Sequence, residues 1–121
     1  MDSQVVEILG RNKLVEELIR AGLEVSVPVR DRGIDLIAYA DLFTNVQAFV
    51  ARPIQMKAAS NRSFGLDRKF AKFPNLLIAY VWHLDRAEAV ATFALTYEEA
   101  LVARGQLTSG WSGPAEQWVA S

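Results

Sequence analysis

Cysteine is absent from this chain of 121 residues, and the only histidine is His83. The first absence excludes disulfide bonds and thiolate metal sites. The second excludes His-rich zinc sites and leaves any Ser-His-Asp arrangement dependent on His83. No apolar run approaches the roughly 20 residues that span a bilayer, and the first residues lack the basic segment that opens a signal peptide. We therefore expect a cytoplasmic protein without membrane contact.

A large net charge is also missing: the formal value of -1 gives no overall support for nucleic-acid binding. The charges are nonetheless unevenly spread. Residues 28–75 carry eight basic and four acidic side chains, whereas acidic side chains outnumber basic ones on both sides of this segment. The chain therefore has a basic middle between acidic ends, for which a dispersed, solvated surface is the alternative interpretation.

What is present is an ordinary globular composition, with 51% hydrophobic and 22% charged residues. The length suits one domain over residues 1–121, with a core in about 4–82 and an extension in 83–121. Apolar periodicity predicts a helix, three strands, a short helix, two strands and a last helix. Their expected positions are 5–21, 23–29, 34–39, 46–58, within 60–72, 76–82, 90–95, and 97 to about 103.

Particular residues set the expected boundaries. Gly22 is placed to end the first helix, and Pro53 should split or bulge the third strand because proline donates no ladder hydrogen bond. Thr96 and Glu99 have the spacing of a capping box at the start of the last helix, and Gly105 lies just past its expected end. The apolar residues expected on the inner sides of the first and the short helix are Val6, Leu9, Leu14, Leu18, Ile19, Leu66, Phe70 and Phe73.

This order of elements predicts an α/β fold with a mixed sheet of about five strands. The first three strands can form a meander. The fourth strand, at 76–82, is almost purely apolar and follows a helix, so we expect it to lie parallel to a neighbour through a right-handed crossover.

Two segments of this sheet carry polar groups that suggest chemistry. Asp35 opens the second strand, and the third strand carries Gln55 and Lys57 at i and i+2. Side chains alternate along a strand, so Gln55 and Lys57 face one way and Met56 the other. If the two strands are neighbours, a carboxylate, an amide and an ammonium group meet at one place. Asp35 and the Gln55 carbonyl oxygen are then the candidate ligands of Mg²⁺ or Mn²⁺, and Lys57 can stabilise charge on a phosphate.

These residues resemble the site of the PD-(D/E)XK nuclease superfamily, in particular its small Holliday-junction-resolvase-like and restriction-endonuclease-like domains. Asp35 resembles the first aspartate of the motif, although Gly-Ile precedes it rather than proline. Gln55, Met56 and Lys57 resemble the (D/E)-X-K element, with glutamine in the acidic position. The resemblance covers roughly residues 4–82 and implies a restriction-endonuclease-like αβββαβ core and metal-dependent cleavage of DNA.

The resemblance also implies a glutamate near the start of the first helix, about eleven residues before the glycine that ends it. Counting back from Gly22 reaches Arg11. Glu7, one turn earlier on the same helix face, is the candidate substitute. Glu16 and Glu17 are alternatives on other faces.

Several other residues are candidates for contact with nucleic acid. Cationic side chains of the basic middle could touch phosphates, or could simply be solvated: Arg30, Arg32, Arg62, Lys69 and Lys72. Asn61, Arg62 and Ser63 follow Lys57 closely and could form a polar rim to the site. Trp111 and Trp118 are expected to pack the tail or to form a dimer contact.

Three functions stay open at this point. The first is a Mg²⁺- or Mn²⁺-dependent DNA endonuclease, which we expect to act as a homodimer because two cuts are simplest with two symmetry-related sites. The second is a catalytically inactive module of the same fold that binds nucleic acid or a protein partner; the amide at Gln55 and the missing helix glutamate favour it. The third is an unrelated α/β domain whose Asp35 and Lys57 match by chance.

Overall fold

The computed structural model describes residues 1–30, 32–40 and 49–110, the side chains of 106–110 excepted. In chain order its helices, strands and 3₁₀ helices (η) are α1 (Ser3–Arg20), β1 (Leu23–Ser26), β2 (Leu36–Ala40), β3 (Ala51–Ala58), η1 (Arg68–Lys72), β4 (Leu77–Trp82), η2 (Ala87–Ala89), β5 (Ala91–Thr96) and α2 (Tyr97–Gly110).

The five strands form one mixed sheet in the order β1-β2-β3-β4-β5. The first three are antiparallel neighbours, β3 and β4 are parallel, and β4 and β5 are antiparallel. The predicted α/β class, the meander and the parallel fourth strand are therefore confirmed. The parallel pair requires the chain to cross over between residues 59 and 76, and this crossover carries η1.

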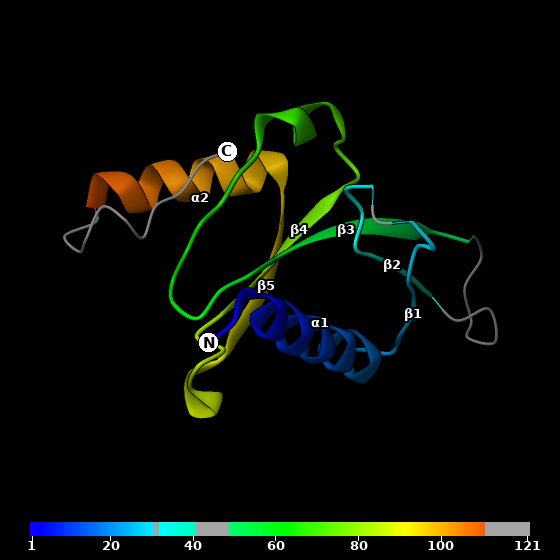
Figure 1. Ribbon diagram of the computed structural model, residues 1–121. Coiled ribbons are helices and arrows are strands. Elements are labelled where there is room, and N and C mark those ends of the chain that lie inside the picture. Colours follow the sequence, from blue (N-terminus) through cyan, green and yellow to red (C-terminus); the bar gives the residue numbers. More distant parts are fainter. Residues whose placement is uncertain (31, 41–48, 111–121) are drawn as a thin grey trace.

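Helices cover both faces of the sheet, with α1 on one side and α2 together with η1 on the other (Figure 1). This arrangement explains why β4 is apolar throughout: five of its six residues are buried because both of its faces are covered. Neither helix of the described chain combines the length and the apolar character needed to cross a membrane.

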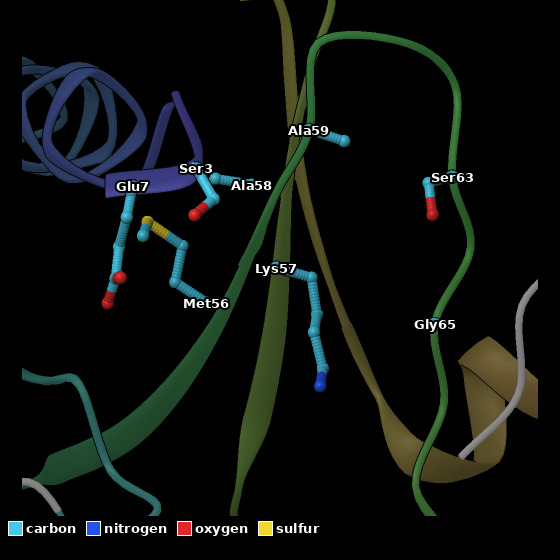
Figure 2. Close-up of a pocket in the computed structure, with 8 residues that line it drawn as sticks. All are labelled: Ser3, Glu7, Met56, Lys57, Ala58, Ala59, Ser63 and Gly65. Carbon is cyan, nitrogen blue, oxygen red and sulfur yellow. The ribbon is translucent and has the colours of Figure 1, made fainter. Parts of the chain in front are cut away.

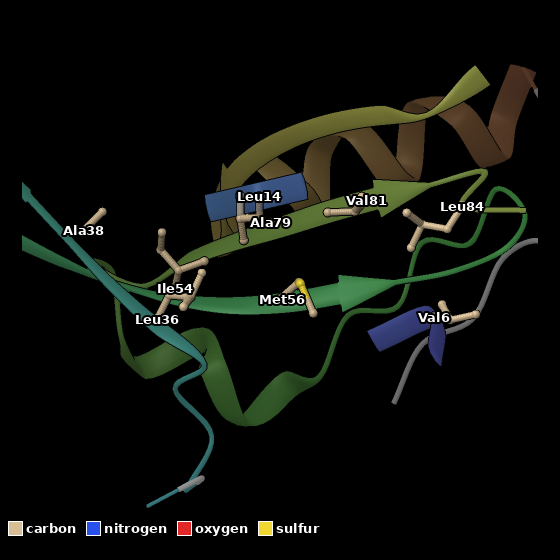
Figure 3. Packing of buried hydrophobic residues seen from close by; sticks show 9 residues of the cluster. All are labelled: Val6, Leu14, Leu36, Ala38, Ile54, Met56, Ala79, Val81 and Leu84. Carbon is tan, nitrogen blue, oxygen red and sulfur yellow. The ribbon is translucent and has the colours of Figure 1, made fainter. Parts of the chain in front are cut away.

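The face under α1 holds the first apolar core (Figure 3). Helix α1 buries Val6, Gly10 and Leu14, which recur every four residues and so lie along one side of the helix. The prediction that Leu9 and Ile19 belong to this side is wrong, since 39% and 57% of their surfaces are exposed. Both lie off the four-residue row, and the small Gly10 takes the inward position between Val6 and Leu14.

Gly10 is the point of closest approach between α1 and the sheet. A Cβ atom built on it would lie 2.6 Å from the Cβ of Ala58, at the end of β3. Real carbon atoms do not approach so closely, so only glycine fits there without a shift of the helix. The absence of this one side chain brings the first turns of α1 down onto β3.

The opposite face holds a second core made mainly of aromatic rings. Phe64 stacks on Tyr80 with ring centroids 4.5 Å apart, and Phe93 lies 5.2 Å from Tyr80 and 4.8 Å from Trp82. Tyr80 is fully buried, and Phe64 is 1% exposed. Two of these rings come from β4 and one from β5, while Phe64 belongs to the crossover. The core therefore fixes the crossover against the sheet.

Two strand boundaries differ from those predicted. β1 ends at Ser26 rather than at residue 29, and Val29 is fully exposed, so apolar alternation continued past the paired residues. Pro53 does not split β3, which is continuous from Ala51 and pairs Pro53 with Ile37. Pairing with β4 begins one residue later, at Ile54, so the missing N–H of Pro53 removes no hydrogen bond from that ladder. The predicted strand residues 46–48 lie outside the described residues.

The predicted capping box is confirmed. Glu99 N–H donates to Thr96 Oγ1 at 3.2 Å, and Thr96 N–H donates to Glu99 Oε1 at 2.9 Å. The hydrogen bond that the Thr96 N–H donates to the carboxylate is the main reason that the pKa of Glu99 lies below its usual value. The helix that follows does not end before Gly105 but continues to Gly110, since an exposed glycine inside a helix is only a modest cost. Trp111 and Trp118 lie outside the described residues.

Candidate functional site

Asp35 lies immediately before β2, where the pairing of β2 with β3 ends. Its own N–H donates to the carbonyl of Ile54 at 2.9 Å, and its Oδ2 accepts from the N–H of Met56 at 2.7 Å. If β2 began earlier in the chain, the Met56 N–H would pair with a backbone carbonyl of that strand. The Asp35 carboxylate accepts this hydrogen bond instead. It also lies against the backbone between Gln55 and Lys57. The structure therefore brings these predicted neighbours together through a contact that the sequence did not predict.

Gln55 and Lys57 lie on the face of β3 opposite to Met56. Met56 is 7% exposed and packs in the core under α1, so alternation turns its two neighbours toward the other face. The Oε1 atom of Gln55 is buried and has no hydrogen-bond partner among the described residues. A buried amide oxygen without a partner is costly, so this atom is suited to a ligand that can supply one.

Glu7 and Lys57 line one pocket of about 440 Å³, together with Met56 and the Ser63–Gly65 part of the crossover. Figure 2 shows Glu7 descending from α1 and Lys57 extending from β3, with Ser63 on the far side of Lys57. The close approach at Gly10, one turn after Glu7, positions α1 for this. Among the candidate glutamates, Glu7 is the one that lines the same pocket as Lys57.

The four predicted catalytic residues do not all open into this pocket, because Asp35 and Gln55 are not among the residues that line it. Met56 is the common neighbour: its N–H binds Asp35 and its side chain lines the pocket with Glu7 and Lys57. Within the described ranges, no three His, Cys, Asp or Glu side chains lie close enough together to hold a metal ion. Any metal would therefore rest on fewer carboxylates, supplemented by amide or backbone oxygens.

The far wall of the pocket is held by two aromatic side chains of β4. The Tyr80 hydroxyl donates to the carbonyl of Gly65 at 2.7 Å, and Trp82 Nε1 donates to the carbonyl of Ser63 at 2.6 Å. Burial of Tyr80 raises the pKa of its hydroxyl, which therefore stays a donor. Of the predicted polar rim, Ser63 lines the pocket, while Asn61 is exposed and Arg62 half-buried.

Three of the predicted phosphate-binding residues gather at a second place. Two adjoining pockets of about 390 Å³ each are lined in part by the same residues, and we call this region the basic hollow. The lining shared by both pockets consists of Arg32, Gly33, Phe70, Lys72 and Phe73, and Lys69 lines one of them. Arg32 comes from the turn before β2, and the lysines come from η1. Gly33 makes this turn possible, since its φ of +99° favours glycine.

Phe73 was predicted to lie in the core, and this is wrong. Its surface is 48% exposed, whereas Phe70 is 6% exposed. Residues three apart in a 3₁₀ helix point the same way, but η1 ends at Lys72 and the backbone of Phe73, with φ -118° and ψ 80°, has already left the helical conformation. Phe70 points inward from the helix, and Phe73 follows its end. The consequence is an exposed aromatic ring among cations.

Asp67 is a residue near the site that sequence reasoning missed. It caps η1 by accepting from Lys69 N–H at 3.0 Å, and this bond is the main reason that its pKa is lowered. The charge of Lys57 adds slightly to the effect, so Lys57 lies within electrostatic reach of the start of η1. The signal available in the sequence was an Asp two residues before a lysine at a helix start.

The remaining predicted residues lie apart from these two pockets. Arg30 is exposed, and Arg62 lies on the crossover outside the lining of either one. Arg11, at the position expected for a glutamate, is half-buried, and its Nε atom has no hydrogen-bond partner in the described part of the chain. A guanidinium group has no acceptor atom, so Arg11 cannot replace the expected glutamate as a metal ligand.

Comparison with protein-family models, curated proteins and solved structures found no match to this chain.

Proposed function

We propose that this protein is a nuclease-like enzyme that hydrolyses phosphodiester bonds of DNA with the help of a divalent metal ion. The observation that carries the proposal is that three side chains are neighbours of Met56: one from α1, one from the residue before β2 and one from β3. Asp35 binds the Met56 N–H, and Glu7 and Lys57 line the pocket that Met56 also lines. Two carboxylates and an ammonium group are the residue types that this reaction uses.

The donor groups fit a hard divalent cation by type. Mg²⁺ commonly binds through one or two carboxylates and keeps several waters, so it does not require a cluster of three. Asp35 would hold it, with the unpartnered Gln55 Oε1 as a neutral oxygen donor, while Glu7 contributes its charge from the neighbouring pocket. The bond to Met56 occupies Asp35 Oδ2 but does not exhaust a carboxylate, which has about four acceptor positions. When bound, the metal supplies positive charge at the phosphate and makes its bound water more acidic.

The chain's own residues position and stabilise the reacting phosphate. Lys57 places a point charge in the pocket, where it can offset the negative charge that grows on the phosphate oxygens in the transition state. Asp35 is held in one orientation by its Met56 bond, so it loses little freedom when a ligand arrives. The basic hollow adds Arg32, Lys69 and Lys72 as contacts for the flanking phosphates.

The test uses Asp35→Asn and Lys57→Gln, assayed on supercoiled plasmid and on a branched DNA junction with Mg²⁺ or Mn²⁺. Asparagine keeps an oxygen for the Met56 N–H but removes the charge, so the fold should survive while cleavage falls by about 10²-fold or more. Glu98→Gln, an exposed carboxylate on α2, is the matched control and should cut like wild type.

If the wild type leaves both DNAs intact with every metal, the enzymatic proposal fails. If Asp35→Asn cuts as fast as wild type, the assignment of the site fails even though cleavage occurs.

A second candidate is a non-catalytic module of the same fold that binds nucleic acid. Two observations favour it: Gln55 is neutral where a carboxylate is expected, and Arg11 stands where the helix glutamate is expected. Calorimetry separates the two, because a binding module would take up no Mn²⁺ yet still bind DNA in a salt-sensitive way. A protein partner and the expected homodimer stay predictions, and sedimentation of the purified chain tests the latter.

A further inference from the structure

We propose that the basic hollow binds an unpaired nucleobase together with its phosphate, so that the protein takes nucleic acid as a single strand or with a base turned out of the stack. The inference rests on the proposed nucleic-acid ligand and adds the form in which that ligand is bound. It concerns a surface separate from Asp35, Gln55 and Lys57.

The first observation is the apolar lining of the hollow. One of its two pockets is lined by Ile34, Pro53, Phe73, Pro74 and Leu76, and Ile34 and Phe73 are 36% and 48% exposed. Leu76 is buried, but Ile34 and Phe73 leave apolar surface uncovered in the hollow. A volume of about 390 Å³ is within the range of small-molecule sites and accommodates one heterocyclic base.

The second observation is the cationic rim. Arg32 and Lys72 line both parts of the hollow, and Lys69 lines one of them. Asp67 partly balances Lys69, because their charged atoms lie 3.6 Å apart. The remaining excess is positive. An apolar lining within a positive rim complements a ligand that is flat and apolar at one end and anionic at the other.

The third observation concerns the aromatic rings. Lys72 lies over the ring of Phe73 with Nζ 5.3 Å from the centroid, and Lys69 lies over Phe70 at 5.2 Å. Each cation is therefore already located at an aromatic face. If a base stacks on Phe73, the phosphate of the same nucleotide would lie close to these ammonium groups. Stacking on aromatic side chains combined with cationic contacts is how proteins hold unpaired strands without reading their sequence.

This chemistry selects an unpaired base over a duplex. In a duplex the bases are stacked on each other, so only phosphates would reach the rim and the apolar lining would stay uncovered. An acidic peptide would also satisfy the rim, but it offers no flat ring for Phe73.

The experiment compares two fluorescein-labelled strands of equal length and charge, about 12 nucleotides each, which spans a typical single-strand site. One strand is oligo-thymidine, and the other is abasic at every position. Binding is followed by fluorescence anisotropy with EDTA present, so that cleavage plays no part. Wild type should bind the thymidine strand at least about fivefold more tightly than the abasic strand, because each stacked base contributes measurably.

Phe73→Ala should lose this preference and bind both strands alike, and Phe73→Trp should restore it. Phe49→Ala is the control: Phe49 is 60% exposed but lies outside the hollow, against Tyr39 at 5.7 Å. Equal binding of both strands by wild type would overturn the inference, as would a uniform loss in Phe73→Ala. A polyglutamate peptide that competes as well as the thymidine strand would also overturn it, since the hollow would then suit an acidic protein segment.

The outcomes separate this inference from the proposed function. If the protein cleaves DNA but binds the thymidine and abasic strands alike, only the inference about the basic hollow is overturned. A base preference without cleavage leaves the inference standing and selects the non-catalytic candidate. No binding of either strand also overturns the inference, and the proposed function is then decided by the cleavage assay alone.

Discussion

At the scale of single residues, Gly10 has the clearest structural consequence. In most helices, replacing an interior glycine by alanine stabilises the protein by about 1 kcal/mol, because alanine loses less backbone entropy on folding. At Gly10 the added methyl group would meet Ala58 Cβ at 2.6 Å, and neither short side chain can turn away. The helix itself has to move.

We therefore predict that Gly10→Ala lowers the free energy of unfolding by roughly 1–3 kcal/mol, the usual cost of overpacking. Gly105→Ala is the matched control, since no atom lies within 4 Å of its added Cβ, and it should raise stability by about 0.5–1 kcal/mol. Urea denaturation of both variants provides the measurement. A stabilised Gly10→Ala protein would contradict the packing described here.

The contrast between Asp35 and Gly10 shows what the sequence can and cannot reveal about single residues. Asp35 was identified because an acidic residue before an apolar run is visible in the chain. Its bond to Met56 was not, because the bond depends on β2 beginning at Leu36, opposite Ile54, while β3 continues to Ala58. Gly10 looked unremarkable, since the partner that requires it is Ala58, far along the chain.

At the scale of elements, the crossover 59–76 is held to the sheet by few but specific bonds. Tyr80 is fully buried and donates to the Gly65 carbonyl, which forms part of the pocket wall. Tyr80→Phe removes the donor and keeps the ring, so the aromatic stack should persist while the carbonyl loses this partner. We predict a loss of about 1–3 kcal/mol in the free energy of unfolding.

The contribution of Tyr80 to the stability of the protein should depend on pH. Burial raises the pKa of Tyr80 above its unfolded value of about 10, so the folded state resists ionisation. The stability that Tyr80 contributes is complete below pH 10 and declines as pH rises further, because the unfolded chain can then release the proton. Above pH 10 the free energies of unfolding of wild type and Tyr80→Phe should therefore become more similar. A constant difference from pH 8 to 11 would refute the assignment.

Helix and strand boundaries were predicted well where the local sequence determines them. They were predicted poorly where a contact with another element determines them. The capping box at Thr96 needs only residues three apart, and it was found. The end of β1 at Ser26 depends on where β2 stops pairing, so alternation through Val29 was misleading. The burial of Phe70 but not Phe73 depends on the end of η1 at Lys72, which the apolar pattern does not encode.

At the scale of the whole molecule, the charge is concentrated rather than large. The net charge is -1, yet the basic hollow draws Arg32 from one turn and Lys69 and Lys72 from the crossover. The basic middle predicted from the sequence therefore becomes a local surface, because the fold brings its two ends to one place. The order of elements could be predicted from the sequence. The proximity of Arg32 to Lys69 and Lys72 could not, because it depends on the β2–β3 register.

We predict a salt dependence that reflects this concentration. If the three cations meet three phosphates, the logarithm of the single-strand affinity should fall with the logarithm of the salt concentration with a slope of about -2. Lys72→Gln should reduce the magnitude of the slope by about 0.7, and Lys13→Gln, on α1 and outside the hollow, should leave it unchanged. Titration of the labelled strand at several salt concentrations measures both slopes, and equal slopes for Lys72→Gln and wild type would exclude Lys72 as a phosphate contact.

The single parallel pair of strands has a kinetic consequence. Strands β1, β2 and β3 are neighbours in sequence as well as in the sheet, whereas β3 meets β4 only after the chain has closed the loop through residues 59–76. Loop closure of this kind is paid before its contacts are gained, so the meander should fold first and the crossover should settle late. Contacts that form late affect escape from the native state more than entry into it. Substitutions in the wall of the pocket or in the basic hollow should therefore change mainly the unfolding rate of the protein.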